Sequence, residues 1–233
     1  MKLGITIATF YKRDGSTFDY LSRALTSIKN QTHQDYMVYL IGDDYEKPKE
    51  LEELSKIIDP KKMQLKNLPV ALERSKYSGK ALWVCGGCNA SNTGIDMSLG
   101  DGINYICHLD HDDYWESNHL EEIDGAIKKT KSNFICTLAN NEGKIMPKIK
   151  SNEKYIKYIP QPTKLIHSST CINFNYFKIR YRNTIEECGW MSPSDGDMWK
   201  RIADFLILKN ESGICVNAIT TIKDSNMSTM KNI

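Results

Sequence analysis

The chain alternates short apolar runs with segments of helical periodicity. The runs are rich in β-branched residues or continuously apolar, which is typical of strands in a covered sheet. They lie at residues 3–10, 36–41, 61–68, 105–109, 134–138, 171–174 and 214–219. Apolar positions spaced as on one face of a helix occur after Ser16, at 49–58, at 90–99, at 120–127 and after Ser194. This order predicts an α/β fold with a mostly parallel central sheet and helices on both faces.

Three local patterns refine this picture. Ser16 followed by Asp19 resembles a capping box at the start of the first helix. Residues 69–80 are polar and predict a mobile loop near the carboxyl ends of the strands. Residues 140–162 are rich in lysine with few apolar anchors, which predicts a loop or weakly paired strand.

Composition limits the class of protein. The chain has 233 residues, 40% of them hydrophobic, which is enough for one well-filled domain. The net charge of +2 provides no field that would favour nucleic acid or an anionic membrane, so no nucleic-acid partner is expected. No apolar run approaches the roughly 18 residues of a membrane span, and the expected location is the cytoplasm.

The seven cysteines are odd in number and lie within apolar runs. This usage predicts reduced, buried thiols. The segment from Cys85 to Cys88 has the CxxC spacing, which can bind zinc or support thiol exchange. No second CxxC or histidine pair accompanies it, so structural thiols are favoured over a metal or redox role.

Two of the predicted strands end in acidic residues. Asp110, Asp112 and Asp113 follow the run at 105–109, and Asp43 with Asp44 follows the run at 36–41. Open α/β sheets bind ligands at this edge, and close carboxylates repel one another unless a cation is present. A divalent ion carrying a diphosphate would suit such a site. The alternative is a solvated acidic turn that caps the helix beginning near residue 117.

The order of six segments is more specific than any one of them. They read ITIATFYKRD, NQTHQDYMVYLIGDD, NASNTGI, YICHLDHDD, IHSS and SDGDMWKRI. Together, from about Leu3 to Ile202, they resemble the inverting family 2 glycosyltransferases of GT-A fold, including the spore-coat enzyme type. The resemblance implies a single domain over residues 1–233. Residues of about 1–115 would bind the nucleotide sugar, and the smaller, irregular part at about 116–233 would bind the acceptor.

The resemblance implies a donor site for a nucleoside diphosphate sugar, with UDP expected as the nucleotide. Asp44 would accept a hydrogen bond from a uracil N–H, with Asp43 beside it. Thr9 and Tyr11 match positions that line the same base pocket. The alternative for the acidic pair is a turn and helix cap.

The segment from Asp110 to Asp113 matches the family's DxD region. The resemblance places Asp110 at the ribose and makes Asp112 and Asp113 the ligands of Mn²⁺ or Mg²⁺ on the diphosphate. Such an ion would neutralise the charge that builds on the leaving group. His111 takes the variable middle position and is not assigned to the site.

Residues 194–199 match a Glu-Asp-x-Asp-x-Trp segment in which the first Asp is the base, here Asp195. A base is needed because the hydroxyl of the acceptor must lose its proton as it attacks the anomeric carbon and inverts it. Asp195 could instead serve as an N-cap, and the two roles are compatible. Asp197 is the fallback for the base, and Trp199 is expected to be a packing residue that walls the acceptor site.

His167, followed by Ser168 and Ser169, matches a His-Ser pair that lies between donor and acceptor in the family. It is expected either to line the acceptor site or to be an ordinary hydrogen-bonded histidine.

Three departures from the family pattern stand out. Ser194 replaces an acid, and residues 90–92 read Ala-Ser-Asn where many members have Ala-Arg-Asn. Residues 221–224 read Thr-Ile-Lys-Asp where many members have Arg-x-His. Lys223 could bind the diphosphate by charge but is a poor metal ligand.

These features favour a metal-dependent inverting glycosyltransferase that moves a sugar to a glycan or other hydroxyl acceptor. A sugar nucleotidyltransferase on a similar sheet would need a glycine-rich loop for a triphosphate, which residues 8–15 lack. A nucleotide-binding pseudoenzyme without a base is the third possibility, and Asp195 argues against it.

Overall fold

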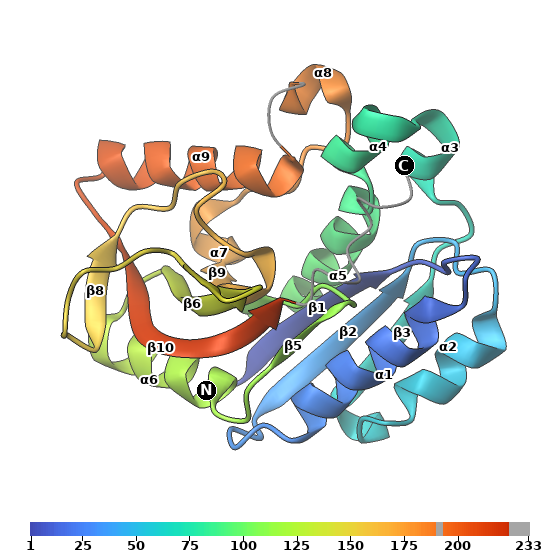
Figure 1. The fold of residues 1–233 in the computed structure, drawn as a ribbon, viewed down its shortest axis with the longest axis horizontal. Helices are drawn as coiled ribbons and strands as arrows, with labels where there is room; N and C mark the ends of the chain where they lie inside the picture. Colours follow the sequence, from blue (N-terminus) through green and yellow to red (C-terminus); the bar gives the residue numbers. More distant parts are fainter. Residues whose placement is uncertain (190–192, 224–233) are drawn as a thin grey trace.

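The computed structural model describes residues 1–189 and 193–223, and these form one twisted ten-stranded sheet with helices on both faces (Figure 1). The strands are β1 Leu3–Thr9, β2 Tyr36–Gly42, β3 Met63–Asn67, β4 Tyr105–His108, β5 Asp113–Trp115, β6 Phe134–Asn141, β7 Lys144–Met146, β8 Tyr155–Tyr158, β9 Thr170–Asn173 and β10 Gly213–Lys223. The α-helices are α1 Ser16–Lys29, α2 Pro48–Ser55, α3 Leu72–Lys76, α4 Gly79–Cys85, α5 Cys88–Gly100, α6 His119–Thr130, α7 Phe174–Phe177, α8 Ile185–Cys188 and α9 Ser194–Leu208. Two 3₁₀ turns, η1 Pro60–Lys62 and η2 His167–Ser169, complete the elements.

The strands follow the order β3-β2-β1-β4-β9-β6-β10-β5, with β7 paired to β6 and β8 to β10. The first four of these strands are parallel. Strand β9 lies antiparallel between β4 and β6, so β6 and its parallel neighbour β10 run in the direction of β1. Six of the ten strands therefore share one direction. The predicted α/β class and mostly parallel sheet are confirmed.

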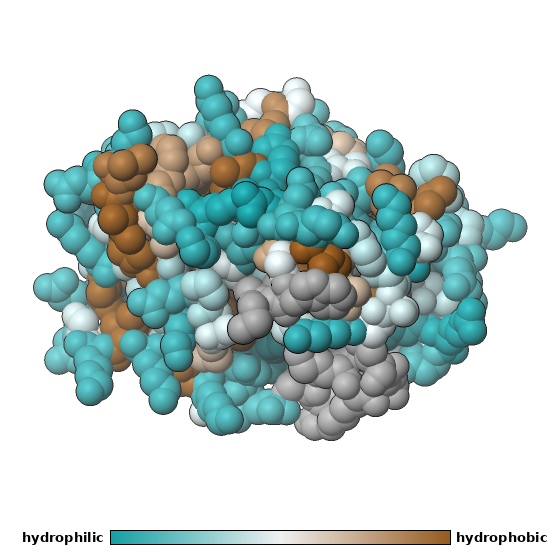
Figure 2. Space-filling model, turned by 90° about the horizontal axis from the view of Figure 1, so that it is seen from above, coloured by the Kyte–Doolittle hydropathy of each residue, from teal (hydrophilic) through white to brown (hydrophobic). Residues whose placement is uncertain are grey.

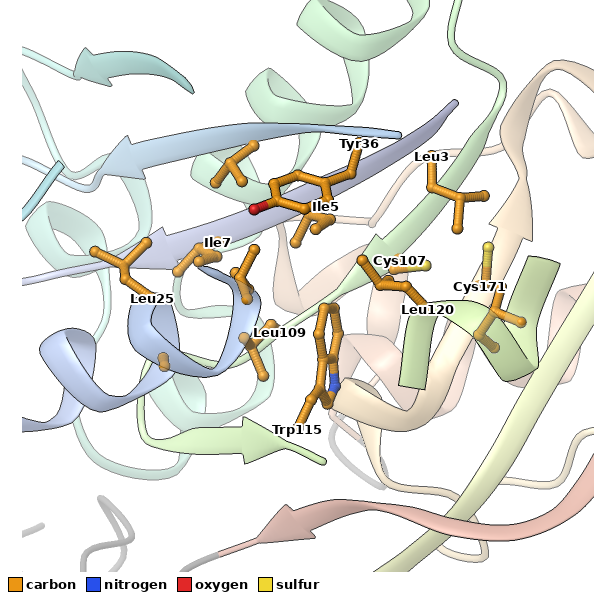
Figure 3. Close-up of a cluster of buried hydrophobic side chains, with 14 of the residues drawn as sticks. Leu3, Ile5, Ile7, Leu25, Tyr36, Cys107, Leu109, Trp115, Leu120 and Cys171 are labelled. Atoms are coloured by element: carbon orange, nitrogen blue, oxygen red, sulfur yellow. The ribbon is translucent and has the colours of Figure 1, made fainter. Parts of the chain in front are cut away.

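One face of the sheet is covered by α1, α2 and α6 (Figure 1). Leu21, Leu25 and Ile28 form the buried stripe of α1 and pack against β1, as their helical spacing predicts. Figure 3 shows Ile5 and Ile7 of β1 meeting Leu25 in this cluster. The burial of this stripe fixes α1 on the sheet, so the loop before it is held over the carboxyl end of β1.

The other face is covered by α5 and α9. Ile95 of α5 and Trp199 and Ile202 of α9 are buried with Phe134 of β6. Since α9 packs through these apolar residues, its first turn is brought to the edge of the sheet where the parallel strands end (Figure 1).

Two local predictions are wrong. Ser16 does not form a capping box; Gly15 precedes α1 in a left-handed conformation with φ of 76°, and the Ser16 N–H donates to Asp14 Oδ1 at 2.9 Å. Residues 69–80 do not form a loop throughout, because α3 lies within them and α4 begins at Gly79. The polar residues of this segment predicted a loop, but α3 is helical because of tertiary contacts that are described below.

The irregular second half is more ordered than its composition indicates. Strands β7 and β8 occupy part of residues 140–162 and pair antiparallel with β6 and β10, in agreement with the weakly paired strand that was left open. Strand β10 extends to Lys223, four residues beyond the predicted end. This extension carries Lys223 to the acidic end of the sheet.

All seven cysteines are free, and six of them are buried, as predicted for structural thiols. Cys85 ends α4 and Cys88 begins α5. In the described part of the chain, no cluster of three or more histidine, cysteine or acidic side chains is arranged to hold a metal. Across residues 1–189 and 193–223, no helix combines the length and the apolar character that a bilayer crossing requires.

The surface above α9 is mainly hydrophilic, with apolar side chains gathered in patches (Figure 2). The most exposed large apolar residues are Ile207 and Leu208 at the end of α9. This end of α9 is the one farther from Asp195, which lies in the first turn of the helix.

A buried histidine makes the stability of the fold dependent on pH. His119 is fully buried at the start of α6, its Nδ1 is 2.7 Å from Thr220 Oγ1, and its ring stacks on Trp115. Burial lowers the pKa of His119 from 6.5 to about 3, so between these values the unfolded chain binds a proton that the folded chain does not. The free energy of unfolding therefore falls as the pH falls through this window.

We expect His119→Asn, which cannot titrate here but can still bond Thr220, to reduce this dependence. Between pH 7 and pH 5 the parent protein should lose about 2 kcal/mol more of its unfolding free energy than the variant does, at about 1.4 kcal/mol per pH unit. Urea unfolding at the two pH values measures both losses. Equal losses in parent and variant would contradict the assignment.

Candidate active site

The carboxyl ends of β1, β2 and β4 meet at one edge of the sheet, which is where open α/β sheets bind ligands. β1 and β2 are aligned so that Thr9 lies opposite Gly42, and the residues after both strands enter the same space. A pocket of about 270 Å³ lies there. It is lined by Phe10, Tyr11, Asp43, Asp44, Glu46, Val70, Ala71, Arg74 and Ser75.

Asp43 carries a buried carboxylate at this pocket. Its backbone N–H donates to Thr9 O at 2.7 Å, and its Oδ2 accepts from Arg74 Nε at 3.1 Å. Its Oδ1 is buried and finds no hydrogen-bond partner in the part of the chain that the structure describes. Burial raises the pKa of Asp43, and the Arg74 guanidinium works against this. The pocket therefore contains a buried acceptor atom that a ligand N–H could satisfy.

Asp44 lies beside it at the exposed rim, with a left-handed φ of 52°. The turn is held by Asn67, whose side chain accepts from Tyr45 N at 2.8 Å and donates to Tyr45 O at 3.1 Å. A Cβ at Gly42 would collide with the Asn67 side chain. Glycine is therefore required at this close approach.

Arg74 is a site residue that the sequence did not reveal. Its guanidinium lies 3.5 Å from the centroid of the Phe10 ring and forms the ion pair with Asp43. The same helix is fixed from its other side, because Glu73 Oε1 accepts from Asn89 N at the start of α5 at 2.8 Å. Contacts with residues 16 to 64 positions away thus make α3 a wall of the pocket. In the sequence, only the basic character of residue 74 gave a signal.

Of the two residues that the resemblance assigned to the base pocket, Tyr11 is among the lining residues and Thr9 is not. Thr9 is 1% exposed, and its buried Oγ1 has no hydrogen-bond partner among the described residues. Tyr11 lines the pocket and packs edge to face against Tyr45, with 5.7 Å between ring centroids. Lys47 Nζ lies 4.4 Å from the Tyr11 ring centroid, so a cation–π contact holds this tyrosine in place.

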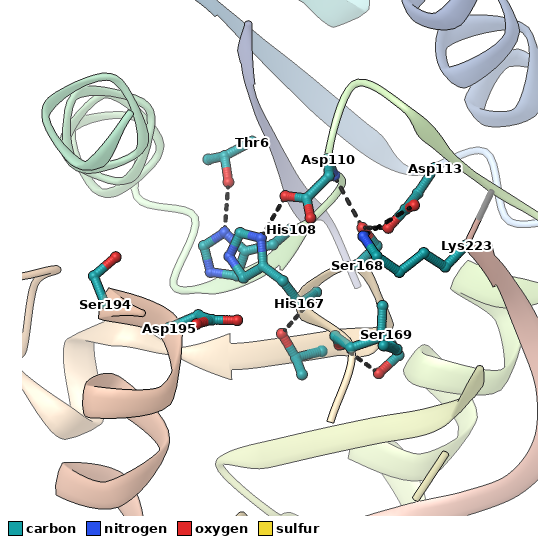
Figure 4. A network of polar contacts seen from close by, with 12 residues as sticks. Thr6, His108, Asp110, Asp113, His167, Ser168, Ser169, Ser194, Asp195 and Lys223 are labelled. Carbon is teal, nitrogen blue, oxygen red and sulfur yellow. Dashed lines mark hydrogen bonds and ion pairs between the residues drawn. The ribbon is translucent and has the colours of Figure 1, made fainter. Parts of the chain in front are cut away.

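Asp110 and His167 form a close pair at the centre of the site (Figure 4). Asp110 Oδ1 is 2.6 Å from His167 Nδ1, and the Asp110 backbone N–H donates to Ser168 Oγ at 3.0 Å. Burial alone would lower the pKa of His167, but the charge and hydrogen bond of Asp110 outweigh it and raise this pKa. The pair therefore favours a carboxylate beside an imidazolium.

Asp112 and Asp113 have different surroundings. The Asp112 side chain is 13% exposed and lies 3.9 Å from Lys12 Nζ. Asp113 is fully buried; its Oδ2 accepts from Ser168 Oγ at 2.6 Å, and its Oδ1 lies 3.6 Å from Lys223 Nζ (Figure 4). Burial raises the pKa of Asp113 to about 7, and the Lys223 ammonium opposes this shift.

Residues 110–113 are called the acidic loop. Lys223 reaches this loop because β10 pairs antiparallel with β5, which places Lys223 directly opposite Asp113. Burial would lower the pKa of Lys223, but the carboxylates of Asp113, Asp110 and Asp112 raise it. A permanent positive charge therefore lies at the acidic end of the sheet. Asp224, the next residue of the quoted segment, lies outside the described residues.

The acidic loop suits a divalent cation that takes most of its ligands from elsewhere. Asp112 presents a partly accessible carboxylate, and within residues 1–189 and 193–223 the buried Asp113 Oδ1 has no hydrogen-bond partner. Mg²⁺ commonly binds one or two carboxylates and completes its shell with water and substrate phosphates. These residues fit that mode of binding, and the described part of the chain offers no cage built wholly from protein ligands.

Asp195 lies in the first turn of α9, and its carboxylate points toward the two histidine rings in Figure 4. It is not the N-cap, a position held by Pro193, and its Oδ1 accepts from Gly196 N at 2.6 Å. Burial raises the pKa of Asp195, and the positive charge of His167 works against this. A carboxylate with a raised pKa is a stronger base, which suits the transfer of a proton.

The neighbours of Asp195 on α9 have structural roles. Asp197 forms ion pairs with Arg182 at 3.2 Å and Arg201 at 2.8 Å, so its carboxylate is not free to act as a base. Trp199 is 1% exposed and packs near His167 and Phe134, as expected of a packing residue. An acceptor could not touch it in this conformation.

Ser194 and His111 are both buried, and each contacts a neighbouring side chain. Ser194 is buried and its Oγ accepts from Cys88 Sγ, which joins the starts of α9 and α5. His111 is buried edge to face against Phe10, and the charges of Asp112 and Asp110 act on its imidazole.

The structure is that of an α/β protein whose candidate ligand site, at the carboxyl ends of its strands, is lined by acidic side chains paired with lysine and arginine. A family model described as Glycosyl transferase family 2 matches residues 6–192. The Uncharacterized glycosyltransferase R139 of Acanthamoeba polyphaga mimivirus is 34% identical over 225 residues, which cover 93% of this chain and 90% of that protein. The chain therefore belongs to glycosyltransferase family 2 and is a transferase of sugars.

More distant proteins agree in sequence or fold. The amylovoran biosynthesis glycosyltransferase AmsB of Erwinia amylovora is 24% identical over 98 residues, 42% of this chain and 28% of that protein. S. aureus TarS in complex with UDP-GlcNAc matches all of this chain with a TM-score of 0.72 at 11% identity. Another S. aureus TarS structure matches 96% of it with a TM-score of 0.69 at 12% identity.

This chain spans 61% and 36% of those two TarS chains. At such identities the likeness shows the fold, which is GT-A as the sequence predicted.

Proposed function

We propose that this protein transfers a sugar from a nucleoside diphosphate sugar, with UDP as the nucleotide, to a hydroxyl group of a glycan or other acceptor, with inversion at the anomeric carbon. The likeness to TarS chains bound to UDP and UDP-GlcNAc supports this donor class. Family membership favours sugar transfer over the nucleotidyltransferase alternative.

The observation that carries the proposal is the convergence of Asp43, the acidic loop and Asp195 around one sheet edge. The Phe10 ring contacts both Arg74 at the pocket and His111 beside the acidic residues, so these two parts of the proposed site are neighbours. Asp195 at the start of α9 lies near His167, the partner of Asp110, in Figure 4, which supports including α9 in the same site. A sugar nucleotide could therefore extend from the pocket beside Asp43 to the proposed general base, Asp195.

In the proposed reaction, the acceptor hydroxyl donates its proton to the Asp195 carboxylate as its oxygen attacks the anomeric carbon. The bond from that carbon to the diphosphate oxygen breaks, and the nucleoside diphosphate leaves with the bonding electron pair. Direct displacement of this kind inverts the anomeric centre. Lys223 and Lys12 would offset charge on the diphosphate, and Asp110 would contact the ribose.

Asp112, together with Oδ1 of Asp113, which Lys223 also faces, would hold Mn²⁺ or Mg²⁺. When bound, such an ion would supply Lewis-acid neutralisation of the leaving diphosphate. The N-terminal part, about residues 1–115, would provide the donor site, and residues 116–233 would provide the base and the acceptor side.

Asp195→Asn is expected to retain donor binding and to lose turnover by on the order of 10²-fold or more, because the amide cannot accept the proton. Release of nucleoside diphosphate from a panel of sugar nucleotides with Mn²⁺, together with sugar incorporation into hydroxyl acceptors, measures this. Asp204→Asn, at an exposed site on the same helix, is the matched control. Normal turnover by Asp195→Asn would show that Asp195 is misassigned. Absence of transfer by the parent protein would favour a binding protein.

Asp112→Ala is expected to weaken donor binding mainly when a divalent ion is present, because it removes a carboxylate that faces the diphosphate. Calorimetric titration with UDP, with and without Mn²⁺, separates the two contributions. The parent protein should gain affinity from Mn²⁺ and the variant should gain much less. Equal gains in the two proteins would contradict the metal assignment.

The two acids after β2 can be distinguished by a matched pair of variants. The buried, unpaired oxygen belongs to Asp43, so we assign the contact with the base N–H to Asp43 and place Asp44 at the rim. Asp43→Asn should lower affinity for UDP by on the order of 10-fold, as expected for a lost charge-assisted hydrogen bond, and Asp44→Asn should lower it less. If Asp44→Asn lost more affinity for UDP than Asp43→Asn, the contact with the base N–H would be assigned to Asp44 instead.

A further inference from the structure

Three aromatic side chains from separate parts of the chain form a cluster behind the site. His108 ends β4, His167 begins η2, and Tyr181 lies in the segment between α7 and α8. The two imidazole rings stack with 4.6 Å between centroids, and the Tyr181 ring meets both of them edge on at 5.6 and 5.7 Å. His108 and Tyr181 are 1% and 5% exposed, so this cluster is largely shielded from water.

The cluster is joined by a chain of hydrogen bonds. Tyr181 Oη is 2.6 Å from His167 Nε2 and 3.4 Å from His108 Nε2. His108 Nδ1 is 2.9 Å from Thr6 Oγ1, and His167 Nδ1 is 2.6 Å from Asp110. Both ring nitrogens of His167 therefore have a hydrogen-bond partner: Asp110 at Nδ1 and Tyr181 at Nε2.

The backbone of Tyr181 is itself clamped. Asn92 of α5 accepts from Tyr181 N at 2.8 Å and donates to Tyr181 O at 2.8 Å. The preceding residue is held as well, since Arg201 of α9 donates to Arg180 O at 2.8 Å. The phenol is thus held rigidly between α5 and α9, and Asn92 is the last residue of the Ala-Ser-Asn segment that the sequence singled out.

The hydrogen bonds can be completed in two ways. With neutral His167, the Tyr181 hydroxyl donates to His167 Nε2 and accepts from His108 Nε2. With protonated His167, the His167 Nε2–H donates to Tyr181 Oη, whose hydroxyl then donates to His108 Nε2. In the second arrangement, His108 Nδ1–H donates to Thr6. Tyr181 satisfies His167 in both states, because a hydroxyl can donate and accept.

We propose that Tyr181, clamped by Asn92, is a positioning residue that fixes the imidazole of His167 between Asp110 and Asp195. Its effect on catalysis rests on the proposed function. Without the phenol oxygen, the His167 ring keeps its bond to Asp110 and its stacking on His108 but loses its partner at Nε2, so its orientation is less restrained. Small misplacements of groups in a site reduce turnover strongly, so the orientation of His167 matters for transfer.

Tyr181→Phe tests this role, because it removes one oxygen and keeps both the ring and the backbone clamp. Tyr105→Phe is the matched control, since the Tyr105 hydroxyl bonds Ser132 O at 3.1 Å and lies outside the cluster. We expect Tyr181→Phe to lower kcat by on the order of 10-fold, with little change in affinity for UDP. The control should leave both unchanged.

A second readout does not require activity. The ¹⁵N chemical shifts of the His167 ring report its tautomer and hydrogen bonds, and in Tyr181→Phe the Nε2 signal should move toward that of an unbonded nitrogen. Unchanged shifts, or the same change in Tyr105→Phe, would overturn the positioning role. Changed shifts with unchanged kcat would overturn its catalytic consequence. If the parent protein transfers no sugar, the proposed function fails, and the shifts alone decide whether Tyr181 positions His167.

Discussion

The structure depends on holding several carboxylates together at one end of a sheet. Asp110, Asp112 and Asp113 follow one another within four residues, and their mutual repulsion must be offset by partners. His167 and Lys223 supply positive charge from other segments of the chain. Breaking a buried pair of this kind leaves an uncompensated charge, which is far more costly than an exposed one. The acidic loop can therefore be buried only when those segments are in place.

This requirement explains the arrangement of the second half of the sheet. Strand β9 follows directly on η2, so its pairing with β4 brings His167 and Ser168 to the acidic loop. Ser168 donates to Asp113 and accepts from the Asp110 backbone, and its carbonyl accepts from Trp115 Nε1 at 2.7 Å. The antiparallel strand β9 therefore brings the acidic loop its partners. The parallel strands β1 and β2 lead into the pocket.

The departure at residue 194 has a related physical reason. Ser194 is buried against Cys88, and burial raises the pKa of that thiol well above its ordinary value. An acid in the same place would meet a neutral thiol rather than a cation, and a buried carboxylate without a cation is costly. A hydroxyl accepts the S–H at little cost, so the serine fits the thiol that this chain places at the start of α5.

The sequence by itself determined which segments become strands and helices where hydrophobic spacing was strong, as in β1, β2 and the stripe of Leu21, Leu25 and Ile28 on α1. It also located Asp43 and Asp110 at strand ends, because a polar residue that terminates an apolar run marks the sheet edge. The tertiary structure decided what those acids contact. Arg74 lies 31 residues from Asp43, and Tyr181 lies 73 residues from His108. Hydrophobic spacing is a local signal that burial selects along one element, whereas ion pairs and hydrogen bonds between distant segments depend on which elements the sheet order brings together.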